Sequence, residues 1–411
     1  MKRNDTSGRK ILILTPQFPY PPQQGTTLRN FNLIAGLAQR HQVYLLSFGE
    51  AVGDRTPLHH LCAQVRIAPT PRRSMQQRLW GLLFSRLPDM AQRLPSASFR
   101  TCLNEIWDQE QPEVIQVEGI ELAPYLLHIA ERRTAPAHPL LIFDDHNAEY
   151  LLQKRAFETD RCIPSRWVAA AYSWVQWRRL QRYERQVCLA ADRVIVVSEH
   201  DAQALRRLVP GLEPGVVPNG VDSDFYTAPA LPLENQPGPN DLVFTGKMDF
   251  RPNVDAVLWF AREVLPLIHR QAPEVRFWVV GKDPHPRLNP LRQDPTVVVT
   301  GQVRDVRPYI SAAAVYIIPL RMGGGTRLKV LEAMAMGKAI VSTSLGCEGF
   351  DLSSGQELVV ADAPVEFASA VLSLLRDPAC RQQLGEAARK LAISRYDWQM
   401  IIPKLEQVYE L

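Results

Sequence analysis

The sequence predicts an α/β protein built from two doubly wound domains, each containing a parallel sheet. Two series of short apolar runs rich in β-branched residues are separated by a proline-rich stretch, and amphipathic stretches lie between most of the runs. The length of 411 residues is too great for one ordinary core. It fits two domains of about 200 residues each. Ligands of such sheets bind beyond the carboxyl ends of the strands.

The predicted strands are apolar along their whole length, which indicates burial on both faces and parallel pairing. The first series is 10–14, 42–48, 113–119, 139–145 and 192–198, and the second is 241–246, 275–281, 296–301, 314–320, 338–343 and 357–362. The amphipathic stretches used for the prediction of helices are 28–39, 254–270 and 327–336.

A linker is predicted at 227–240, which holds four prolines and no apolar periodicity. It separates a predicted N-terminal domain of residues 1–226 from a predicted C-terminal domain of residues 241–395.

Composition and charge narrow the class of protein. Hydrophobic residues make up 46% and charged residues 22%, which is typical of a globular protein. The net charge of +4 is mild, and we expect no nucleic-acid partner. Six cysteines without a C-x-x-C pair argue against a disulfide framework or a zinc site. The apolar run 11–14 is too short for a signal-peptide core, and no stretch approaches the ~20 apolar residues of a spanning helix. We expect a cytoplasmic protein.

The segment IIPLRMGGGTRLKVLEAMAMGKAIVST (317–343) carries the strongest chemical signal. Glycines 323–325 follow a predicted strand, and a helix is expected to begin at 326–327. Glycines at such a turn let the backbone approach a phosphate, and the free N–H groups of the helix start favour an anion. Lys329 can meet a phosphate, and Glu332 on the same helix face can accept two hydrogen bonds from a ribose diol. The alternative is a turn that only permits tight packing, with Lys329 and Glu332 as a solvated pair.

Through RLKVLEAMAMGKAIVST and the order of its flanking motifs, the chain resembles the retaining GT-B glycosyltransferases of family 4 (group 1), in particular bacterial exopolysaccharide-type sugar transferases. The resemblance spans nearly the whole chain. It implies two Rossmann-like domains that face a central cleft, and a C-terminal helix at 396–411 that returns to the N-terminal domain. It also implies that Glu332 holds the nucleotide ribose. The earlier of the family's two glutamates falls at Gly324, so its contact to the donor sugar is missing here. The residues of this loop expected to bind the donor are Gly323, Gly324, Gly325, Thr326, Arg327 and Lys329, with Gly324 acting through its backbone N–H.

A second match is LVFTGKMDFRPNVDA (242–256). Lys247 and Arg251, which follow the strand-end Gly246, take the places that bind the diphosphate in the family. The growing charge of a nucleoside diphosphate leaving group must be neutralised, and two cations remove the need for Mg²⁺. The resemblance therefore implies that no metal and no cofactor is required. The alternative is that both residues are ordinary surface cations.

Further positions follow the family's order. Gly281 closes a strand and Val303 lies in a later loop, and both are expected near the nucleotide base. In the N-terminal domain, Gly25 and Thr26 precede a helix, and the resemblance implies that their loop reaches toward the donor phosphate and the acceptor. This loop lacks G-x-G-x-x-G, which argues against an NAD dehydrogenase.

His146 follows a predicted strand in IFDDHNAEY, and the resemblance places it beside the donor sugar. The polar neighbours Asp144, Asp145 and Asn147 at a strand end favour a functional histidine over a structural one. Glu118, at the end of EVIQVEG, is a weaker candidate for contact with the acceptor.

The segment 72–94 holds five arginines against one aspartate, interleaved with leucines, a tryptophan and a phenylalanine. A basic amphipathic segment of this kind can lie in an anionic membrane interface, and 165–186 mixes tryptophans with arginines in the same way. The favoured interpretation is helices packed on the sheet with solvated arginines. Many relatives in the family use lipid-linked acceptors, so contact of 72–94 with the inner face of the plasma membrane stays open as the alternative.

The function predicted from these observations is a retaining, metal-independent hexosyl transfer from a nucleotide sugar to a saccharide or lipid-linked acceptor, in cell-surface or exopolysaccharide biosynthesis. The predicted catalytic set is His146, Lys247, Arg251 and Glu332. Two alternatives stay open. A GT-B nucleotide-sugar epimerase would use Glu118, Asp144 and Asp145 to activate water and shuttle protons. A non-catalytic nucleotide-sugar-binding partner subunit is favoured by the glycine at 324.

Overall fold

The computed structural model describes residues 8–22, 25–50, 56–133, 139–227 and 234–410. The chain divides into two compact units. The first contains the chain up to Pro218 together with the segment from Ile401 onward, and the second is Asn219–Met400. Most of the predicted linker, residues 228–233, lies outside the described residues.

The division falls at Pro218, earlier than the predicted domain boundary at 226. The residues after Pro218 are bonded to the second unit, since the Val221 N–H donates to the Tyr396 carbonyl at 2.8 Å and the Ser223 N–H to Asp397 at 3.1 Å. The last helix, α16 (Trp398–Tyr409), begins close to the predicted position 396, and its residues from Ile401 onward belong to the first unit.

The described part of the first unit has a sheet of seven parallel strands in the order β3-β2-β1-β4-β5-β6-β7. All five predicted strands are present. Two strands escaped prediction because one is an edge strand with alternating polar residues and the other is only two residues long. The strands are β1 (Lys10–Thr15), β2 (Gln42–Gly49), β3 (Gln64–Pro69), β4 (Val114–Glu118), β5 (Leu140–Asp145), β6 (Arg193–Val196) and β7 (Gly215–Val216).

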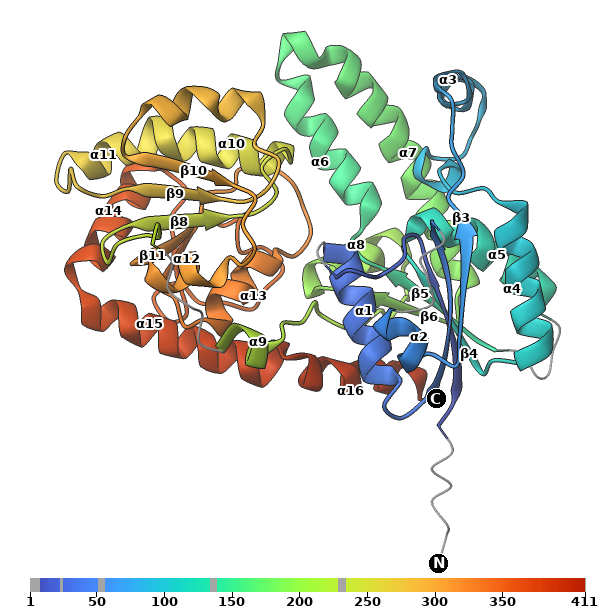
Figure 1. The fold of residues 1–411 in the computed structure, drawn as a ribbon. Helices are drawn as coiled ribbons and strands as arrows, with labels where there is room; N and C mark the ends of the chain where they lie inside the picture. The colour runs from blue at the N-terminus through green and yellow to red at the C-terminus, as the bar shows by residue number, and fades with distance from the viewer. Residues whose placement is uncertain (1–7, 23–24, 51–55, 134–138, 228–233, 411) are drawn as a thin grey trace, which may run out of the picture. The chain divides into compact units, whose positions relative to one another are not determined.

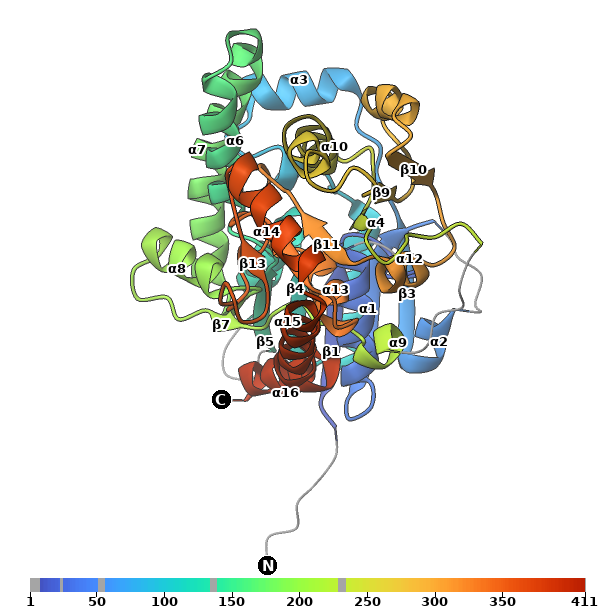
Figure 2. The ribbon, with the colours of Figure 1, turned by 90° about the vertical axis from the view of Figure 1, so that its left-hand side faces the viewer.

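Helices flank this sheet, and Figure 1 shows α6 and α7 running side by side and projecting beyond the strands of their unit. In both views α3 also stands apart from the strands (Figures 1 and 2). The helices are α1 (Gly25–Leu37), α2 (Pro57–Leu61), α3 (Met75–Phe84), α4 (Ala97–Glu110), α5 (Ala123–Arg132), α6 (Glu149–Arg161), α7 (Trp167–Ala190) and α8 (Glu199–Leu208).

The described part of the second unit has a sheet of six parallel strands in the order β10-β9-β8-β11-β12-β13, and each corresponds to a predicted strand. The strands are β8 (Leu242–Thr245), β9 (Phe277–Val280), β10 (Val297–Gly301), β11 (Val315–Ile318), β12 (Ile340–Ser342) and β13 (Val359–Val360). The helices are α9 (Ser223–Thr227), α10 (Arg251–Trp259), α11 (Leu265–His269), α12 (Arg307–Ala312), α13 (Leu328–Ala335), α14 (Pro364–Arg376) and α15 (Pro378–Leu391).

The stretch 254–270 is helical but not one regular α-helix. A π-helical turn at Phe260–Val264 separates α10 from α11. Pro266 follows it, and a proline lacks the N–H that would continue the regular hydrogen-bond ladder.

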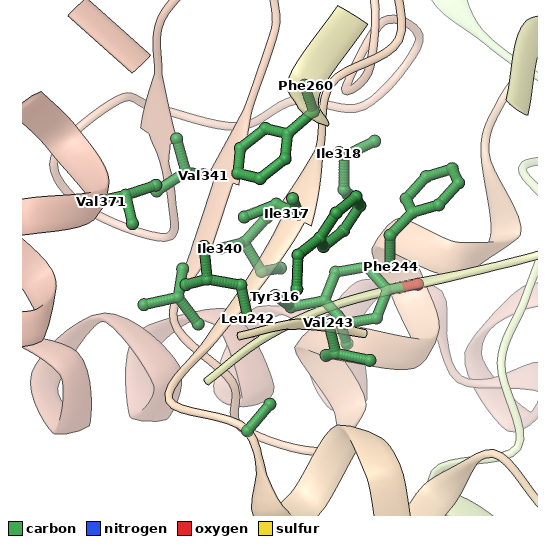
Figure 3. Close-up of a cluster of buried hydrophobic side chains, with 14 of the residues drawn as sticks. Leu242, Val243, Phe244, Phe260, Tyr316, Ile317, Ile318, Ile340, Val341 and Val371 are labelled. Atoms are coloured by element: carbon green, nitrogen blue, oxygen red, sulfur yellow. The ribbon is translucent and has the colours of Figure 1, made fainter. Parts of the chain in front are cut away.

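The core of the second unit lies between its sheet and helices. Figure 3 shows Phe260 and Val371 packed against residues of β8, β11 and β12, and all of these side chains are buried. Consecutive residues such as Tyr316, Ile317 and Ile318 are all fully buried, as expected for a parallel strand covered on both faces.

We expect Phe260→Ala to destabilise the second unit by about 3–5 kcal/mol, because the phenyl ring is fully buried and its removal leaves a cavity. Denaturant unfolding monitored by circular dichroism measures the change. The control is Val365→Ala at a side chain that is 69% exposed, where we expect a change within about 0.5 kcal/mol. Equal effects of the two substitutions would contradict this account of the core.

Candidate functional site

In the first unit, the predicted residue His146 lies directly after β5 and beside the end of β4. Its Nε2 is 2.7 Å from Oε2 of Glu118, the last residue of β4. Glu118 is buried, and the imidazole keeps 16% of its surface exposed. Burial by itself would lower the pKa of His146, but the hydrogen bond to Glu118 and the charges of Asp144 and Glu118 raise it above its ordinary value.

A buried ion pair stands next to this histidine. Asp144 is the register partner of Glu118 in the sheet, and its Oδ2 accepts hydrogen bonds from the Arg29 guanidinium at 2.8 and 3.3 Å. Arg29 also donates to the carbonyls of Val217 and Pro218. A lone buried charge would be costly, and the ion pair offsets that cost for both partners. Among the described residues, Oδ1 of Asp144 has no hydrogen-bond partner. The sequence analysis missed Arg29, because an arginine on an amphipathic helix normally faces solvent.

Arg29 belongs to α1, the helix that begins with the predicted residues Gly25 and Thr26. Both lie exposed in the first turn of α1, one turn before Arg29. The loop residues 23–24 that precede them lie outside the described residues. The structure thus brings the start of α1 and His146 to the same edge of the first sheet through the Arg29–Asp144 contact.

The predicted neighbour Asp145 serves a different part of the unit. Its carboxyl group is buried beside Glu184, whose two oxygens accept the backbone N–H groups of Glu149 and Tyr150 at 2.9 Å. Burial, followed by the nearby Glu184 charge, raises the pKa of Asp145 well above its usual value. Glu184 therefore holds the first turn of α6 in place, and Asp145 lies buried beside it, which is a structural arrangement.

Glu118, Asp144 and His146 have potential ligand atoms within 4.8 Å of one another, so we considered a metal site. Their donor atoms are engaged in other ways. Asp144 forms an ion pair with the guanidinium of Arg29, and Glu118 is hydrogen-bonded to the imidazole of His146. A divalent cation beside the Arg29 charge would be repelled, so the arrangement fits a hydrogen-bonded network better than a metal centre.

In the second unit, the carboxyl end of β8 collects Gly246, Lys247, Asn253 and Lys329. The Lys329 ammonium donates to Oδ1 of Asn253 at 3.0 Å, and Nδ2 of Asn253 donates to the Lys247 carbonyl at 2.8 Å. A Cβ at Gly246 would lie 2.9 Å from the Lys329 ammonium and 2.8 Å from Asn253. Only a glycine leaves room for this cation, so predicted residues from two separate motifs do meet here.

Asn253 is a residue that the sequence analysis missed. It lies two positions after Arg251 in the first turn of α10 and is almost fully buried. Its amide orients Lys329 on one side and the Lys247 backbone on the other. A polar side chain in RPNVDA, where the helix otherwise buries apolar residues, was the available signal.

The two cations of the 242–256 motif lie at the same strand end. Arg251 is the first residue of α10 and is exposed. The Lys247 side chain is 45% exposed, and its ammonium is 3.0 Å from Asp249. The edge of the second sheet beside Lys329 therefore carries two further cationic side chains that a soluble ligand can reach.

The glycine loop leads from β11 to α13 and lies against the start of α10. A Cβ at Gly323 would lie 3.3 Å from Pro252, and φ is 103° at Gly323 and 75° at Gly325, values that favour glycine. The Arg327 guanidinium donates to the Gly324 carbonyl. Asn219 donates to the Thr326 hydroxyl at 2.6 Å.

Glu332 lies one turn into α13, on the same side as Lys329, and is half-buried. The phenol of Tyr226, from the short helix α9, hydrogen-bonds to its carboxylate. Burial raises the pKa of Glu332, while the Tyr226 hydrogen bond and the Lys329 charge act against that shift. The pair is thus half-buried at the sheet edge, unlike the solvated pair of the alternative interpretation.

Two predicted base-contact residues have packing roles. A Cβ at Gly281 would lie 1.7 Å from the Gly246 carbonyl oxygen, so this glycine permits the close approach of the ends of β8 and β9. Val303 is partly buried against the core of the second unit. Neither observation tests contact with a base, and both assignments stay predictions.

An exposed apolar surface lies on the first unit, at α3 and the start of α7. Within the described residues α3 has no buried side chain, and Arg179 of α7 fastens it by hydrogen bonds to the carbonyls of Gly81 and Leu82. Trp80 is 65% exposed and Phe84 is 70% exposed. The other exposed apolar residues here are Met75, Leu79, Leu83, Leu87, Ile163, Trp167, Val168, Tyr172 and Trp174.

Comparison with known proteins gives matches over most of the chain. The family model described as Glycosyltransferase Family 4 matches residues 24–225, and the model described as Glycosyl transferases group 1 matches residues 239–377. An uncharacterized 44.6 kDa protein in the cps region of Klebsiella pneumoniae is 21% identical over 404 residues, covering 94% of this chain and 96% of that protein.

A phosphatidyl-myo-inositol mannosyltransferase of Mycobacterium tuberculosis is 30% identical over 208 residues, covering 47% of this chain and 53% of that enzyme. Among solved structures, Anabaena HepE in complex with UDP superposes with a TM-score of 0.67 at 14% identity, covering 98% of this chain and 100% of that chain. Within the described residues, no helix combines the length and the apolar character needed to cross a bilayer.

The environment of Lys329 generates a pH prediction. Burial lowers its pKa from 10.5 to about 7. Between these values the unfolded chain holds a proton that the folded protein lacks, so this group makes stability rise with pH. Lys329→Met removes a buried group whose charged form is disfavoured, so we expect the variant to be more stable than the native protein at pH 7.5. We expect this difference in the free energy of unfolding to shrink by about 1 kcal/mol for each pH unit up to pH 9.5.

Denaturant unfolding at pH 7.5, 8.5 and 9.5 measures this difference. The control is Lys390→Met, which removes an exposed lysine of the same unit and is expected to shift stability equally at all three values. A parallel pH profile for Lys329→Met and the native protein would show that Lys329 is not desolvated.

Proposed function

Because the chain belongs to glycosyltransferase family 4 and has the GT-B fold, we propose that it transfers a sugar, with retention, from a nucleotide-sugar donor to a saccharide or lipid-linked acceptor. The observation that carries this proposal is the cationic, glycine-lined edge of the second unit, where Lys329 is held beside Gly246 and Lys247. This edge offers charge and space to the two phosphates of a donor.

The diphosphate is assigned to Lys247, Arg251, Lys329 and the backbone of the loop 323–326. When the glycosidic bond breaks, negative charge grows on the leaving phosphate. Cations placed there beforehand lower the barrier without a metal ion. An anion next to Lys329 also favours its charged form, which the protein interior by itself disfavours.

Glu332 is assigned to the ribose of the nucleotide. A carboxylate accepts two hydrogen bonds from a cis-diol, and Glu332 stands one helical turn beyond the phosphate-binding lysine. Tyr226, which now occupies the Glu332 carboxylate, would share it with the ribose or move aside. Gly324 supplies no carboxylate for the donor sugar, so we assign that contact to backbone N–H groups of the loop.

The first unit supplies His146 on the side of the transferred sugar and the acceptor, together with the start of α1 at Gly25 and Thr26. In the proposed reaction, the bond from the anomeric carbon to the phosphate oxygen breaks. The acceptor oxygen bonds to the same face of that carbon. Its proton passes to the leaving phosphate.

The relatives suggest the setting of this reaction. The Anabaena protein binds UDP, and the Klebsiella protein is named from a cps region, so we propose a role in polysaccharide biosynthesis at the cytoplasmic side of the cell. The mannosyltransferase of M. tuberculosis is named for a lipid, phosphatidyl-myo-inositol, which supports a lipid-linked acceptor as one option.

The absence of an acid at 324 supports a second candidate, a non-catalytic subunit that binds a nucleotide sugar. An epimerase is less well supported. Its candidate carboxylates are occupied, since Asp144 is paired with Arg29, Asp145 is buried with Glu184, and Glu118 binds His146.

A thermal-shift panel of UDP, GDP, ADP and CMP sugars tests the donor site. We expect one nucleotide sugar to raise the melting temperature, and Glu332→Ala combined with Lys247→Ala to remove most of that shift. The matched control is Glu366→Ala with Lys390→Ala in the same unit, expected to keep the full shift. An unchanged shift in the site variant would contradict the assignment. A stabilising sugar that is neither transferred nor hydrolysed would favour the non-catalytic subunit.

We also propose that the exposed surface of α3 and the start of α7 contacts a membrane. Aromatic and leucine side chains there are left in water, where their burial in a lipid interface is favourable. The single acid of 72–94, Asp89, is already paired with Arg73 at 2.9 Å and Arg93 at 3.3 Å. The exposed Arg72, Arg78 and Arg86 are thus available to anionic headgroups.

Co-sedimentation with vesicles containing an anionic phospholipid tests this surface. We expect Trp80→Ser with Phe84→Ser to reduce binding about tenfold or more, because two large apolar anchors are lost. We expect Arg72→Gln with Arg78→Gln to weaken binding most at low salt. The control is Val365→Ser with Arg262→Gln on the second unit, which should bind like the native protein. Vesicle binding that none of these substitutions changes would rule out the surface.

A further inference from the structure

A line of buried polar side chains leads from the C-terminal helix to His146. The Tyr409 hydroxyl donates to Oε1 of Gln116, Nε2 of Gln116 donates to Oε1 of Glu118, and Oε2 of Glu118 meets Nε2 of His146. The three distances are 2.5, 2.5 and 2.7 Å. Tyr409, Gln116 and Glu118 are each at most 2% exposed.

The alternation of β4 creates this line. Gln116 and Glu118 are two residues apart in a strand, so their side chains leave the same face of the sheet. Apolar neighbours occupy the other face. Tyr409 then reaches Gln116 from α16, whose close packing is visible at two glycines. A Cβ at Gly36 would lie 2.3 Å from Ile402, and one at Gly215 would lie 2.8 Å from Val408.

The direction of each hydrogen bond follows from chemistry. A phenol donates to an amide carbonyl, which leaves the amide nitrogen of Gln116 to donate to Glu118. A carboxylate has no donor of its own. The second oxygen of Glu118 therefore accepts the Nε2–H of His146. The imidazole is thereby held in one tautomer, with Nε2 protonated and Nδ1 left for a partner outside the network.

Such a network is not needed for stability. Burying amide, carboxyl and phenol groups costs desolvation energy that their hydrogen bonds only offset, and apolar residues of similar volume would stabilise the sheet at least as well. The gain from these polar residues lies in the orientation of the group at the end of the line, which is the partly exposed His146.

We propose that Tyr409, Gln116 and Glu118 are positioning residues that fix the tautomer and orientation of His146, so that the C-terminal helix supports the histidine cluster of the first unit. The catalytic value of this positioning rests on the proposed function. The positioning itself is a property of the free protein and can be measured without any substrate.

Several charged groups act on the same imidazole. Glu118 comes from β4, Asp144 from β5, Arg29 from α1 and Glu149 from α6. Asp144 and Glu118 favour the imidazolium, and Arg29 opposes it. Glu149 is expected to favour it as well once ionised, although burial raises its pKa to about 8. Among the residues that the structure describes, Glu118 alone is hydrogen-bonded to the ring, so it links the ring to the line from Tyr409.

The experiment is a ¹⁵N and ¹³C NMR titration of histidine-labelled full-length protein, with the native chain compared to Tyr409→Phe and Glu118→Gln. In the native protein we expect neutral His146 to be the Nε2–H tautomer. In Glu118→Gln we expect the pKa of His146 to fall by about one unit or more, because a charge partner is lost.

In Tyr409→Phe, Gln116 loses its donor and can rotate, so we expect a mixed tautomer population at His146. We expect kcat to fall about threefold to tenfold with KM nearly unchanged, a change in orientation and not in binding. The matched control is Tyr44→Phe. It removes a different, partly buried phenol hydrogen bond of the first unit, from Tyr44 to Glu110, and should leave the His146 spectrum as in the native protein.

A predominant Nδ1–H tautomer in the native protein would overturn the proposal, as would a folded Tyr409→Phe variant whose His146 titrates as in the native chain. If Tyr409→Phe does not fold, the native tautomer and the Glu118→Gln titration still decide. Should His146 respond as expected while the native protein transfers no sugar, the proposed function fails and the positioning network stands.

Discussion

Every strand pairing that the structure describes in either sheet is parallel, and this constraint decides where chemistry can occur. Parallel strands need a crossover after each strand, so their carboxyl ends all meet at one edge. The interior of each sheet is covered on both faces and accepts apolar residues. Polar groups therefore gather at the ends of β4 and β5 in the first unit and of β8 in the second. The polar cluster of each unit is a consequence of this geometry.

The same constraint explains how far the sequence could predict the molecule. All eleven predicted strands are present, because continuous apolar runs identify strands buried on both faces. The edge strand β3 alternates polar and apolar residues, and β7 is too short to give a pattern. In the site, a local motif predicted Lys329 and Glu332, whereas Asn253 and Tyr226 join them from other parts of the chain. Partnerships of that kind depend on packing and leave no spacing signal.

Both units hold charged side chains in buried or half-buried positions. The contacts that stabilise these charges differ between the two units. In the first unit Arg29 and Asp144 neutralise each other and are further hydrogen-bonded, while Asp145 is buried beside a second acid, Glu184. In the second, Lys329 is held by a neutral amide and an aromatic face, with Phe244 3.9 Å away. A cation that lacks a full counter-charge is a natural receptor for an anion. Burial disfavours the charged form of Lys329, and this is the physical basis of the phosphate site that we propose there.

The C-terminal segment from Ile401 onward belongs to the first unit, although it follows the whole second unit in the sequence. The first unit is discontinuous, and the second unit occupies Asn219–Met400 as an insert within it. An exchange of the second unit between related proteins would therefore need two junctions, one at each end of Asn219–Met400. A simple fusion after Pro218 would import a foreign terminal helix. Such a chimera would lose the Tyr409 phenol at the far end of the hydrogen-bonded line to His146, even though every residue up to the junction was native.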